Sequence, residues 1–386
     1  MTAVDQFLPF ALPDVADEEI EAVTEAMRSG WLTTGPRAAA FEHEFASFLG
    51  GDVHAVALNS ATAGLHLSLE AAGIRADDEV LVPTWTFTST AEVVRYLGAH
   101  PIFVDVDPVT LTIDLERAAA AVTPRTRAIM PVHFAGLAVH RDGLAAFAHR
   151  HELIVVEDAA HAFPTLSSGS LIGRGDSTAV VFSFYATKTM TTGEGGMVVT
   201  PHESLARRIR TMRLHGISRD VFDRYRATVP SWSYEIVAPG YKYNLTDPAA
   251  AMGRVQLRRS PQMRDRRAEI AARYDEAFSD VPLDLPAHPP AGDRHAWHLY
   301  VVRLREDSGH SRDAFMDAMF TEGIGCSVHF TPLHRHPYWR LTYRLEDAQF
   351  PVASREFARV ASLPIFSSMT DHQVERVVSG VRRVLG

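Results

Sequence analysis

Short apolar runs alternate with helical segments along much of the chain, and this alternation most restricts its fold. Residues 101–106, 128–134 and 153–158 have the length and composition of buried strands. The segments between them, 114–121 and 141–151, have helical patterns. Strands separated by helices are typical of a parallel sheet covered by helices on both faces. We therefore predict an α/β protein with a mainly parallel central sheet in a large domain.

The C-terminal third is expected to form a second, smaller domain. The chain has 386 residues, 46% of them hydrophobic, which is enough for one large domain and a small one. Residues 297–302 alternate like a strand and 312–322 resemble a helix, so the small domain is predicted to be α+β. Ser260 and Pro261 are typical of an N-cap and a first-turn proline that open a helix. We place the large domain at residues 1–255 and the small C-terminal domain at 256–386.

A polar, Gly-rich loop between two apolar runs carries a single lysine. Residues 179–184 and 197–200 flank this loop, which predicts two strands with Lys188 at their rim. A lysine amine attacks carbonyl compounds once burial or a cationic neighbour lowers its pKa. A solvated lysine in a hairpin loop is equally ordinary. The loop alone leaves both interpretations open.

An aspartate ends the apolar strand predicted at residues 153–158. Ligands of open α/β sheets bind at the carboxyl ends of the strands, so Asp158 is expected at a binding edge. A carboxylate there requires a cationic partner, and the protonated pyridine nitrogen of pyridoxal 5′-phosphate (PLP) is one solution. Asp158 followed along the chain by Lys188 therefore indicates PLP.

The strand predicted at residues 53–58 runs directly into a helix that opens with hydroxyls and small residues. Free backbone N–H groups and the helix dipole at such a start can bind phosphate. The same residues also fit an ordinary Ser/Thr N-cap. Given Lys188 and Asp158, we expect Ala61 and Thr62 to hold the cofactor phosphate.

Aromatic and imidazole side chains are expected beside the cofactor ring. Trp85 and Phe87 lie in a strand-to-helix turn, where one of them can stack on a pyridine ring and the other can pack in the core. His161 lies three residues after Asp158 and can hydrogen-bond near the ring. A buried histidine with its bonds satisfied by protein is the alternative.

Three segments resemble one known family, the DegT/DnrJ/EryC1/StrS sugar aminotransferases. They are EDAAHA at 157–162, SFYATKTMTTGEGG at 183–196 and GYKYNLTD at 240–247, and the resemblance runs from about residue 10 to residue 385. It implies the fold-type I, aspartate-aminotransferase-like architecture and a cytoplasmic homodimer with shared active sites. It also implies a role in deoxyamino sugar biosynthesis, in which PLP, through its amine form PMP, carries an amino group from L-glutamate to a nucleotide-linked keto sugar.

The resemblance also implies roles for single residues. Lys188 and Asp158 match the catalytic pair, and Phe87 matches the aromatic that stacks on the cofactor. Asn244 matches an asparagine that reaches the phosphate in the neighbouring subunit, although some relatives carry that asparagine at the position of Lys242. The residues expected to bind cofactor are Ala61, Thr62, Phe87, Asp158, His161, Ser183, Lys188 and Asn244, and those expected to bind substrate are Trp31, Thr33, Lys242 and His329. Trp31 packed between helices is the alternative for that residue.

The resemblance also narrows the substrate. The segments at 240–247 and 191–196 are most similar to relatives that aminate C4 of 4-keto-6-deoxy sugars attached to TDP or UDP. We therefore expect TDP-4-keto-6-deoxyglucose as the acceptor. A C3 aminotransferase acting on a TDP-3-keto sugar is the alternative within this class, and a PLP-binding regulator without turnover is the alternative from another class. A family branch with histidine at the lysine position dehydrates sugars, and Lys188 argues against that branch.

Several other classes are not expected. A net charge of −9 disfavours a nucleic-acid partner, because such surfaces need clustered Lys and Arg. His329, His334 and His336 are separated by prolines, and no nearby carboxylate or thiol has a convincing spacing, so no metal site is expected. The single cysteine, Cys326, excludes an internal disulfide. Residues 1–13 lack a secretory pattern, and no apolar stretch is long enough for a membrane span, so a cytoplasmic protein is expected.

Overall fold

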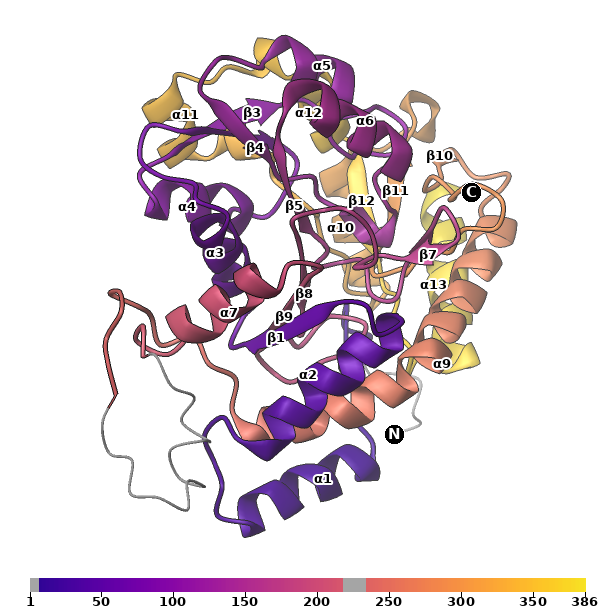
Figure 1. Ribbon diagram of the computed structural model, residues 1–386. Helices are drawn as coiled ribbons and strands as arrows, with labels where there is room; N and C mark the ends of the chain where they lie inside the picture. Colours follow the sequence, from indigo (N-terminus) through magenta and orange to yellow (C-terminus); the bar gives the residue numbers. More distant parts are fainter. Residues whose placement is uncertain (1–6, 218–233) are drawn as a thin grey trace.

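The computed structural model describes residues 7–217 and 234–386, and a seven-strand sheet forms its centre (Figure 1). The strands β3, β2, β4, β5 and β8 are mutually parallel, whereas β9 is antiparallel to both of its neighbours, β8 and β1. The prediction of a mainly parallel sheet is confirmed. In sheet order, the strands are β1 (His54–Leu58), β9 (Gly196–Thr200), β8 (Ala179–Ser183), β5 (Ile154–Asp158), β4 (Thr126–Ile129), β2 (Glu79–Pro83) and β3 (His100–Val104).

Helices cover both faces of this sheet because successive side chains of a strand point to opposite faces. Val56 and Leu58 of β1 pack into one apolar cluster, whereas Ala55 and Ala57 pack into another. The first face carries α3 (Ala61–Ala71), α4 (Ser89–Tyr96) and α7 (Glu203–Met212), and the second carries α2 (Pro36–Leu49), α5 (Leu115–Ala120) and α6 (Arg141–His151).

One long helix, α9 (Asp247–Ala277), connects the two parts of the molecule (Figure 1). It packs against α1 (Asp17–Arg28) and α2, and its second half joins an apolar cluster with the small antiparallel sheet. That sheet and its surroundings comprise β10 (Leu283–Asp284), β11 (Tyr300–Leu304), β12 (Val360–Leu363), α10 (Arg312–Thr321) and α13 (Asp371–Leu385). The remaining elements are α11 (Pro337–Tyr343), α12 (Pro351–Phe357) and the ribbon of β6 (Leu166–Ser167) and β7 (Ser170–Leu171).

The prediction that a helix opens at Ser260 and Pro261 is wrong, because both residues lie inside α9. Proline has no N–H to donate to the carbonyl of Leu257, four residues earlier. The hydroxyl of Ser260 takes over this role and donates to the Leu257 carbonyl at 2.8 Å. The helix therefore continues through the proline. The predicted domain boundary between residues 255 and 256 falls within α9 and remains a prediction.

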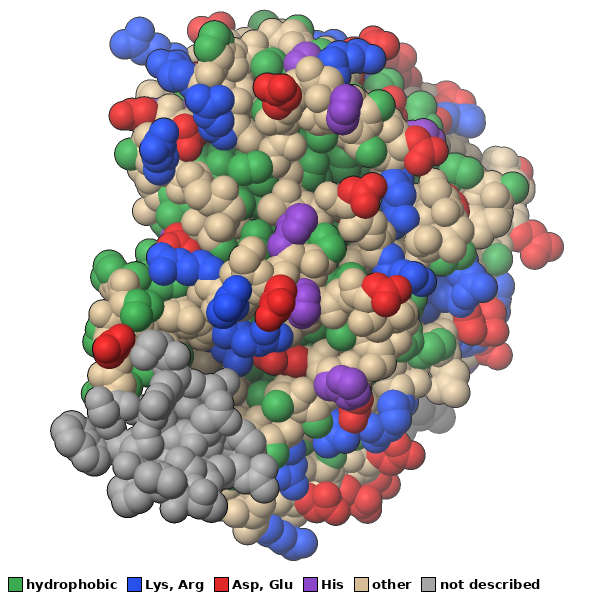
Figure 2. Space-filling view, viewed as in Figure 1, with side chains coloured by type: hydrophobic (Ala, Val, Ile, Leu, Met, Phe, Trp, Pro, Cys, Tyr) green, Lys and Arg blue, Asp and Glu red, His purple; other side chains and the backbone are tan. Residues whose placement is uncertain are grey.

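The hairpin of β8 and β9 is formed as predicted, and the loop between them carries Lys188. The loop therefore lies at the carboxyl end of β8, next to the carboxyl end of β5, where Asp158 stands. Lys and Arg side chains are interspersed with Asp and Glu over the face drawn in Figure 2. In the part of the chain that the structure describes, no helix has the length and apolar character needed to cross a membrane.

Candidate active site

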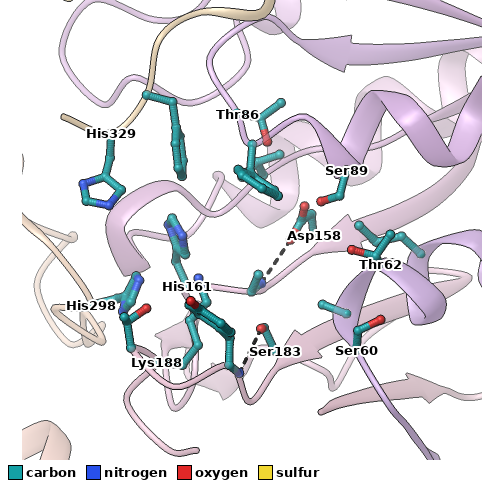
Figure 3. Close-up of a pocket in the computed structure, with 18 of the residues that line it drawn as sticks. Ser60, Thr62, Thr86, Ser89, Asp158, His161, Ser183, Lys188, His298 and His329 are labelled. Carbon is teal, nitrogen blue, oxygen red and sulfur yellow. Dashed lines mark hydrogen bonds between the residues drawn. The ribbon is translucent and has the colours of Figure 1, made fainter. Parts of the chain in front are cut away.

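A cavity of about 530 Å³ opens at the carboxyl ends of β5 and β8 (Figure 3). It brings together side chains from the start of α3, the turn before α4, the end of β5, the β8–β9 hairpin and the small domain. The predicted site residues that line it are Ala61, Thr62, Phe87, Asp158, His161, Ser183, Lys188 and His329.

Lys188 lies in a buried position that favours its unprotonated amine. Its backbone N–H donates to the carbonyl of Tyr185 at 2.9 Å, which fixes the turn that presents the side chain. Burial lowers the pKa of Lys188 to about 8, although the Asp158 carboxylate acts in the opposite direction. A substantial fraction of the amine is therefore unprotonated near neutral pH.

Asp158 is a buried carboxylate held by hydroxyl and amide donors. Asp158 is only 5% exposed. Thr90 Oγ1 donates to Asp158 Oδ2 at 2.8 Å, and the N–H of Ala160 donates to Asp158 Oδ1 at 3.1 Å. Burial raises the pKa of Asp158 in spite of these bonds. Among the described residues, no Lys or Arg side chain hydrogen-bonds to this carboxylate. A protonated pyridine nitrogen fits as the missing cation.

The start of α3 fits the phosphate of PLP. Ser60 Oγ accepts from the N–H of Ala63 at 3.1 Å, and the Ser60 carbonyl accepts from the N–H of Gly64 at 3.2 Å. The N–H groups of Ala61 and Thr62 have no acceptor within residues 7–217 and 234–386, so both can bind an anion.

Gly196 allows the start of α3 to lie directly against β9. A Cβ atom at position 196 would lie 2.5 Å from the carbonyl carbon of Ser60 and 2.6 Å from the nitrogen of Ala61. Any other residue would displace the helix start, so glycine at this position keeps the start of α3 against β9.

His161 is a neutral donor at the cavity wall. The N–H of Ala135 donates to His161 Nδ1 at 3.3 Å, so the neutral ring carries its proton on Nε2. Burial and the nearby Lys188 lower the pKa of His161 well below its usual value. The ring can therefore donate a hydrogen bond into the cavity near neutral pH.

His329 and Phe87 complete the predicted lining. His329 Nδ1 lies 3.0 Å from Ser362 Oγ, and burial lowers the pKa of His329 to about 4. Phe87 is 59% exposed although it is apolar, which leaves its ring available for stacking on a ligand. Trp85 is fully buried in the core, as its alternative interpretation expected.

Four predicted site residues do not line this cavity within one subunit. Trp31 Nε1 donates to the Thr34 carbonyl at 3.2 Å, and the Thr33 carbonyl accepts from the N–H of Asp247 at 3.2 Å. Asn244 Nδ2 donates to Thr34 Oγ1 at 2.7 Å, whereas Lys242 is exposed. These residues lie near one another, outside the lining of this cavity.

Several lining residues were not predicted. Thr86 lines the cavity, and the fully buried Thr90, which does not, links its hydroxyl to Asp158, with 2.8 Å between the two Oγ1 atoms. Their four-residue spacing, at the turn into α4, is the signal that sequence reasoning overlooked. The other unpredicted residues include Ser89, Tyr185, Glu194, His298 and Phe330. Within residues 7–217 and 234–386, no group of three or more His, Cys, Asp or Glu side chains is arranged to hold a metal ion.

Comparisons with known proteins agree with this geometry. The model of the DegT/DnrJ/EryC1/StrS aminotransferase family matches residues 13–382. The spore coat polysaccharide biosynthesis protein SpsC of Bacillus subtilis is 47% identical over 99% of this chain and 98% of the relative.

Among solved structures, the putative sugar aminotransferase Spr1654 of Streptococcus pneumoniae in its PMP form has a TM-score of 0.91 and 30% identity, covering 98% of both chains. PseC of Helicobacter pylori, an aminotransferase involved in the biosynthesis of pseudoaminic acid, has a TM-score of 0.89 and 27% identity. It covers 98% of this chain and 99% of that chain.

Proposed function

Because the chain belongs to the DegT/DnrJ/EryC1/StrS family and is a PLP-dependent sugar aminotransferase, we propose that it transfers the amino group of L-glutamate to C4 of TDP-4-keto-6-deoxyglucose. The observation that carries the chemistry is the cavity in which Lys188, Asp158 and the start of α3 meet. The choice of sugar rests on the segments at 240–247 and 191–196, which resemble those of C4 aminotransferases.

The cofactor would be held at both ends. The N–H groups of Ala61 and Thr62 and the hydroxyl of Ser183 would bind its phosphate, while Asp158 would pair with its ring nitrogen. Phe87 would stack on the ring and His161 would donate a hydrogen bond beside it. Bound there, PLP supplies an electron sink for the negative charge left when a proton is removed from the carbon next to the reacting nitrogen.

Lys188 would be the proton carrier in both half-reactions. It would also hold the cofactor covalently between turnovers. Its amine takes the proton from Cα of L-glutamate as a general base and later delivers a proton to C4 of the sugar as a general acid. A pKa near 8 lets the same amine work in both directions near neutral pH.

We further propose a homodimer with shared active sites. Tyr185 lies at the cavity and is 47% exposed, and Ile236 and Val237 are also largely exposed. Large exposed apolar side chains are typical of protein interfaces. In the dimer, Asn244 would reach the cofactor phosphate of the neighbouring subunit. Trp31, Thr33, Lys242 and His329 would contact the nucleotide sugar.

A single-turnover experiment tests the proposed function. The PLP-loaded protein is converted to its PMP form with L-glutamate, excess donor is removed, and TDP-4-keto-6-deoxyglucose is added while the visible spectrum is followed. Return of the PLP spectrum is expected, and NMR of the product should show nitrogen at C4.

Three other outcomes are informative. If the PMP form reacts only with a TDP-3-keto sugar, the protein is a C3 aminotransferase and the proposed C4 amination is wrong. If only the UDP-linked sugar reacts, the nucleotide of the substrate is UDP and the proposed TDP is wrong. Failure of every amino donor to convert the cofactor would favour a PLP-binding regulator.

A further inference from the structure

One wall of the cavity presents three imidazole rings beside Lys188 (Figure 3). These are His161, His298 and His329. The ring centroids of His161 and His298 are 4.3 Å apart, with an angle of 43° between the planes. Asp158 stands at another part of the lining, and the other acidic residue, Glu194, is exposed in the hairpin loop. The imidazole wall therefore offers nitrogen donors.

His298 differs from the other two histidines in its hydrogen bonding. His161 Nδ1 accepts from Ala135 and His329 Nδ1 contacts Ser362. His298 is only 5% exposed, yet its Nδ1 is buried without a partner, and no hydrogen bond holds its Nε2 within the part of the chain that the structure describes. Because Nδ1 is shielded and Nε2 is not, Nε2 is the ring nitrogen that can reach a ligand in the cavity.

The backbone around His298 is fixed, which orients the ring toward the cavity. The N–H of Leu299 donates to the Ala135 carbonyl at 3.2 Å, and Trp297 adopts a left-handed φ of 50°. The buried guanidinium of Arg267 donates to the carbonyls of Trp297 and His298 at 3.2 and 3.3 Å, and to that of Ile365 at 2.8 Å. The position of the ring is therefore determined by the fold and does not depend on a ligand.

The charges around His298 favour an anion. The titratable groups that act on the ring are His161, Lys188, Arg267 and His329. Lys188 and Arg267 can carry positive charge near neutral pH, whereas burial keeps His161 and His329 neutral. Together with burial, they lower the pKa of His298 well below its usual value. An entering carboxylate would accept a hydrogen bond from the neutral ring, and its charge would raise the pKa of that ring.

We propose that His298 binds the α-carboxylate of the amino donor, an assignment that rests on the proposed aminotransferase function. The α-carboxylate is bonded to the same Cα whose proton Lys188 takes, so it must lie close to the Lys188 amine. The diphosphate of a nucleotide sugar is separated from the keto carbon by the sugar ring and must lie farther away. The position of His298 beside Lys188 therefore favours the carboxylate over the diphosphate.

The test measures binding without turnover. 2-Oxoglutarate cannot accept an amino group from the PLP form, so its affinity for the PLP-loaded protein is measured by calorimetry. Two buffers of different ionisation enthalpy give the number of protons taken up. The variants are His298→Phe, which removes the nitrogen donors, and His298→Asn, which keeps a donor that cannot titrate. His372→Asn, at an exposed position of α13, is the matched control.

We expect His298→Phe to weaken 2-oxoglutarate binding about 10-fold or more, because a hydrogen bond to a charged group is lost. His298→Asn should weaken it less and should reduce proton uptake, whereas the affinity for TDP should stay unchanged in both variants. Unchanged 2-oxoglutarate affinity in His298→Phe, or a loss confined to TDP, would overturn the assignment. If His298→Phe does not retain PLP, His298→Leu is measured in its place, and unchanged 2-oxoglutarate affinity in that variant would overturn the assignment.

The wild-type protein separates this inference from the proposed function. Conversion of its PLP to PMP by L-glutamate tests the function alone. Conversion together with unchanged binding in the His298 variants would overturn only the role of His298. Absence of conversion would overturn the proposal that L-glutamate is the amino donor.

Discussion

Replacement of Thr90 by valine isolates one hydrogen bond at the cofactor site. Thr90 is fully buried, its hydroxyl donates to Asp158 Oδ2 at 2.8 Å, and its Oγ1 lies 2.8 Å from that of Thr86. Valine has nearly the same shape but no hydroxyl. The change therefore removes a donor from the carboxylate and creates little or no cavity.

The expected loss follows from the charge of the acceptor. A hydrogen bond to a charged group contributes about 1.5–3 kcal/mol, and about 1.4 kcal/mol corresponds to a factor of ten in affinity. The loss falls mainly on the PLP-bound protein, because Asp158 must be ionised there to pair with the ring nitrogen. We expect PLP affinity to fall about 10- to 100-fold, and the pKa of Asp158 to rise further in the PLP-free protein.

The assay is a titration of the PLP-free protein with PLP, followed by absorbance, together with thermal unfolding. Thr200→Val is the matched control, because Thr200 is also fully buried and its hydroxyl donates to the Thr178 carbonyl at 2.7 Å, away from the cavity. Both variants should lower the melting temperature, but only Thr90→Val should weaken PLP binding. Thr90→Ser should restore most of the affinity.

Equal PLP affinity in Thr90→Val and the wild type would refute this reasoning. It would mean that Asp158 does not pair with the cofactor, or that water replaces the lost hydroxyl at no cost. If Thr200→Val loses PLP affinity to the same extent, the effect of Thr90→Val is due to general destabilisation of the protein.

Three further predictions follow from the same site. Lys188→Ala should abolish the conversion of L-glutamate to 2-oxoglutarate, since the general base is lost, and full activity in this variant would end the proposed mechanism. Covalent attachment of PLP to the PLP-free protein should accelerate as pH rises through about 8, because only the unprotonated Lys188 amine attacks. The rate is measured by stopped-flow absorbance, and a constant rate across that pH would contradict this prediction. Gly196→Ala should weaken PLP binding, because its Cβ would lie 2.5 Å from the Ser60 carbonyl carbon, and an unchanged dissociation constant in a PLP titration would show that the phosphate lies elsewhere.

The main parts of the site that the sequence predicted lie at the ends of strand-like segments, which are visible in the local sequence. Lys188 lies between two strand-like runs, and Asp158 ends a third, so their meeting at one sheet edge follows from strand polarity alone. The start of α3 is likewise marked by a strand that runs straight into a helix. The α/β class and the hairpin were predictable for the same reason.

The parts that the sequence did not predict depend on contacts between distant segments. His298 enters the cavity because Arg267 and Leu299 fix its backbone, and nothing near it in the sequence indicates that orientation. Pro261 was interpreted by its usual position at a helix start, whereas the Ser260 hydroxyl lets α9 continue through it. The proposed role of Asn244 would depend on a second subunit, so neither the sequence nor one folded chain places it.

The pKa of Lys188 depends on the opposition between burial and the Asp158 carboxylate. Burial alone would lower this pKa further, and the negative charge of Asp158 limits the fall to a value of about 8. A base that is too weak would not remove the Cα proton, and one that stays protonated could not begin the reaction. In the proposed mechanism one amine takes a proton from the donor and delivers one to the sugar, so a pKa close to the working pH would serve both half-reactions. Substitutions at Asp158 or at Thr90 should therefore change the pH dependence of Lys188 as well as the affinity for PLP.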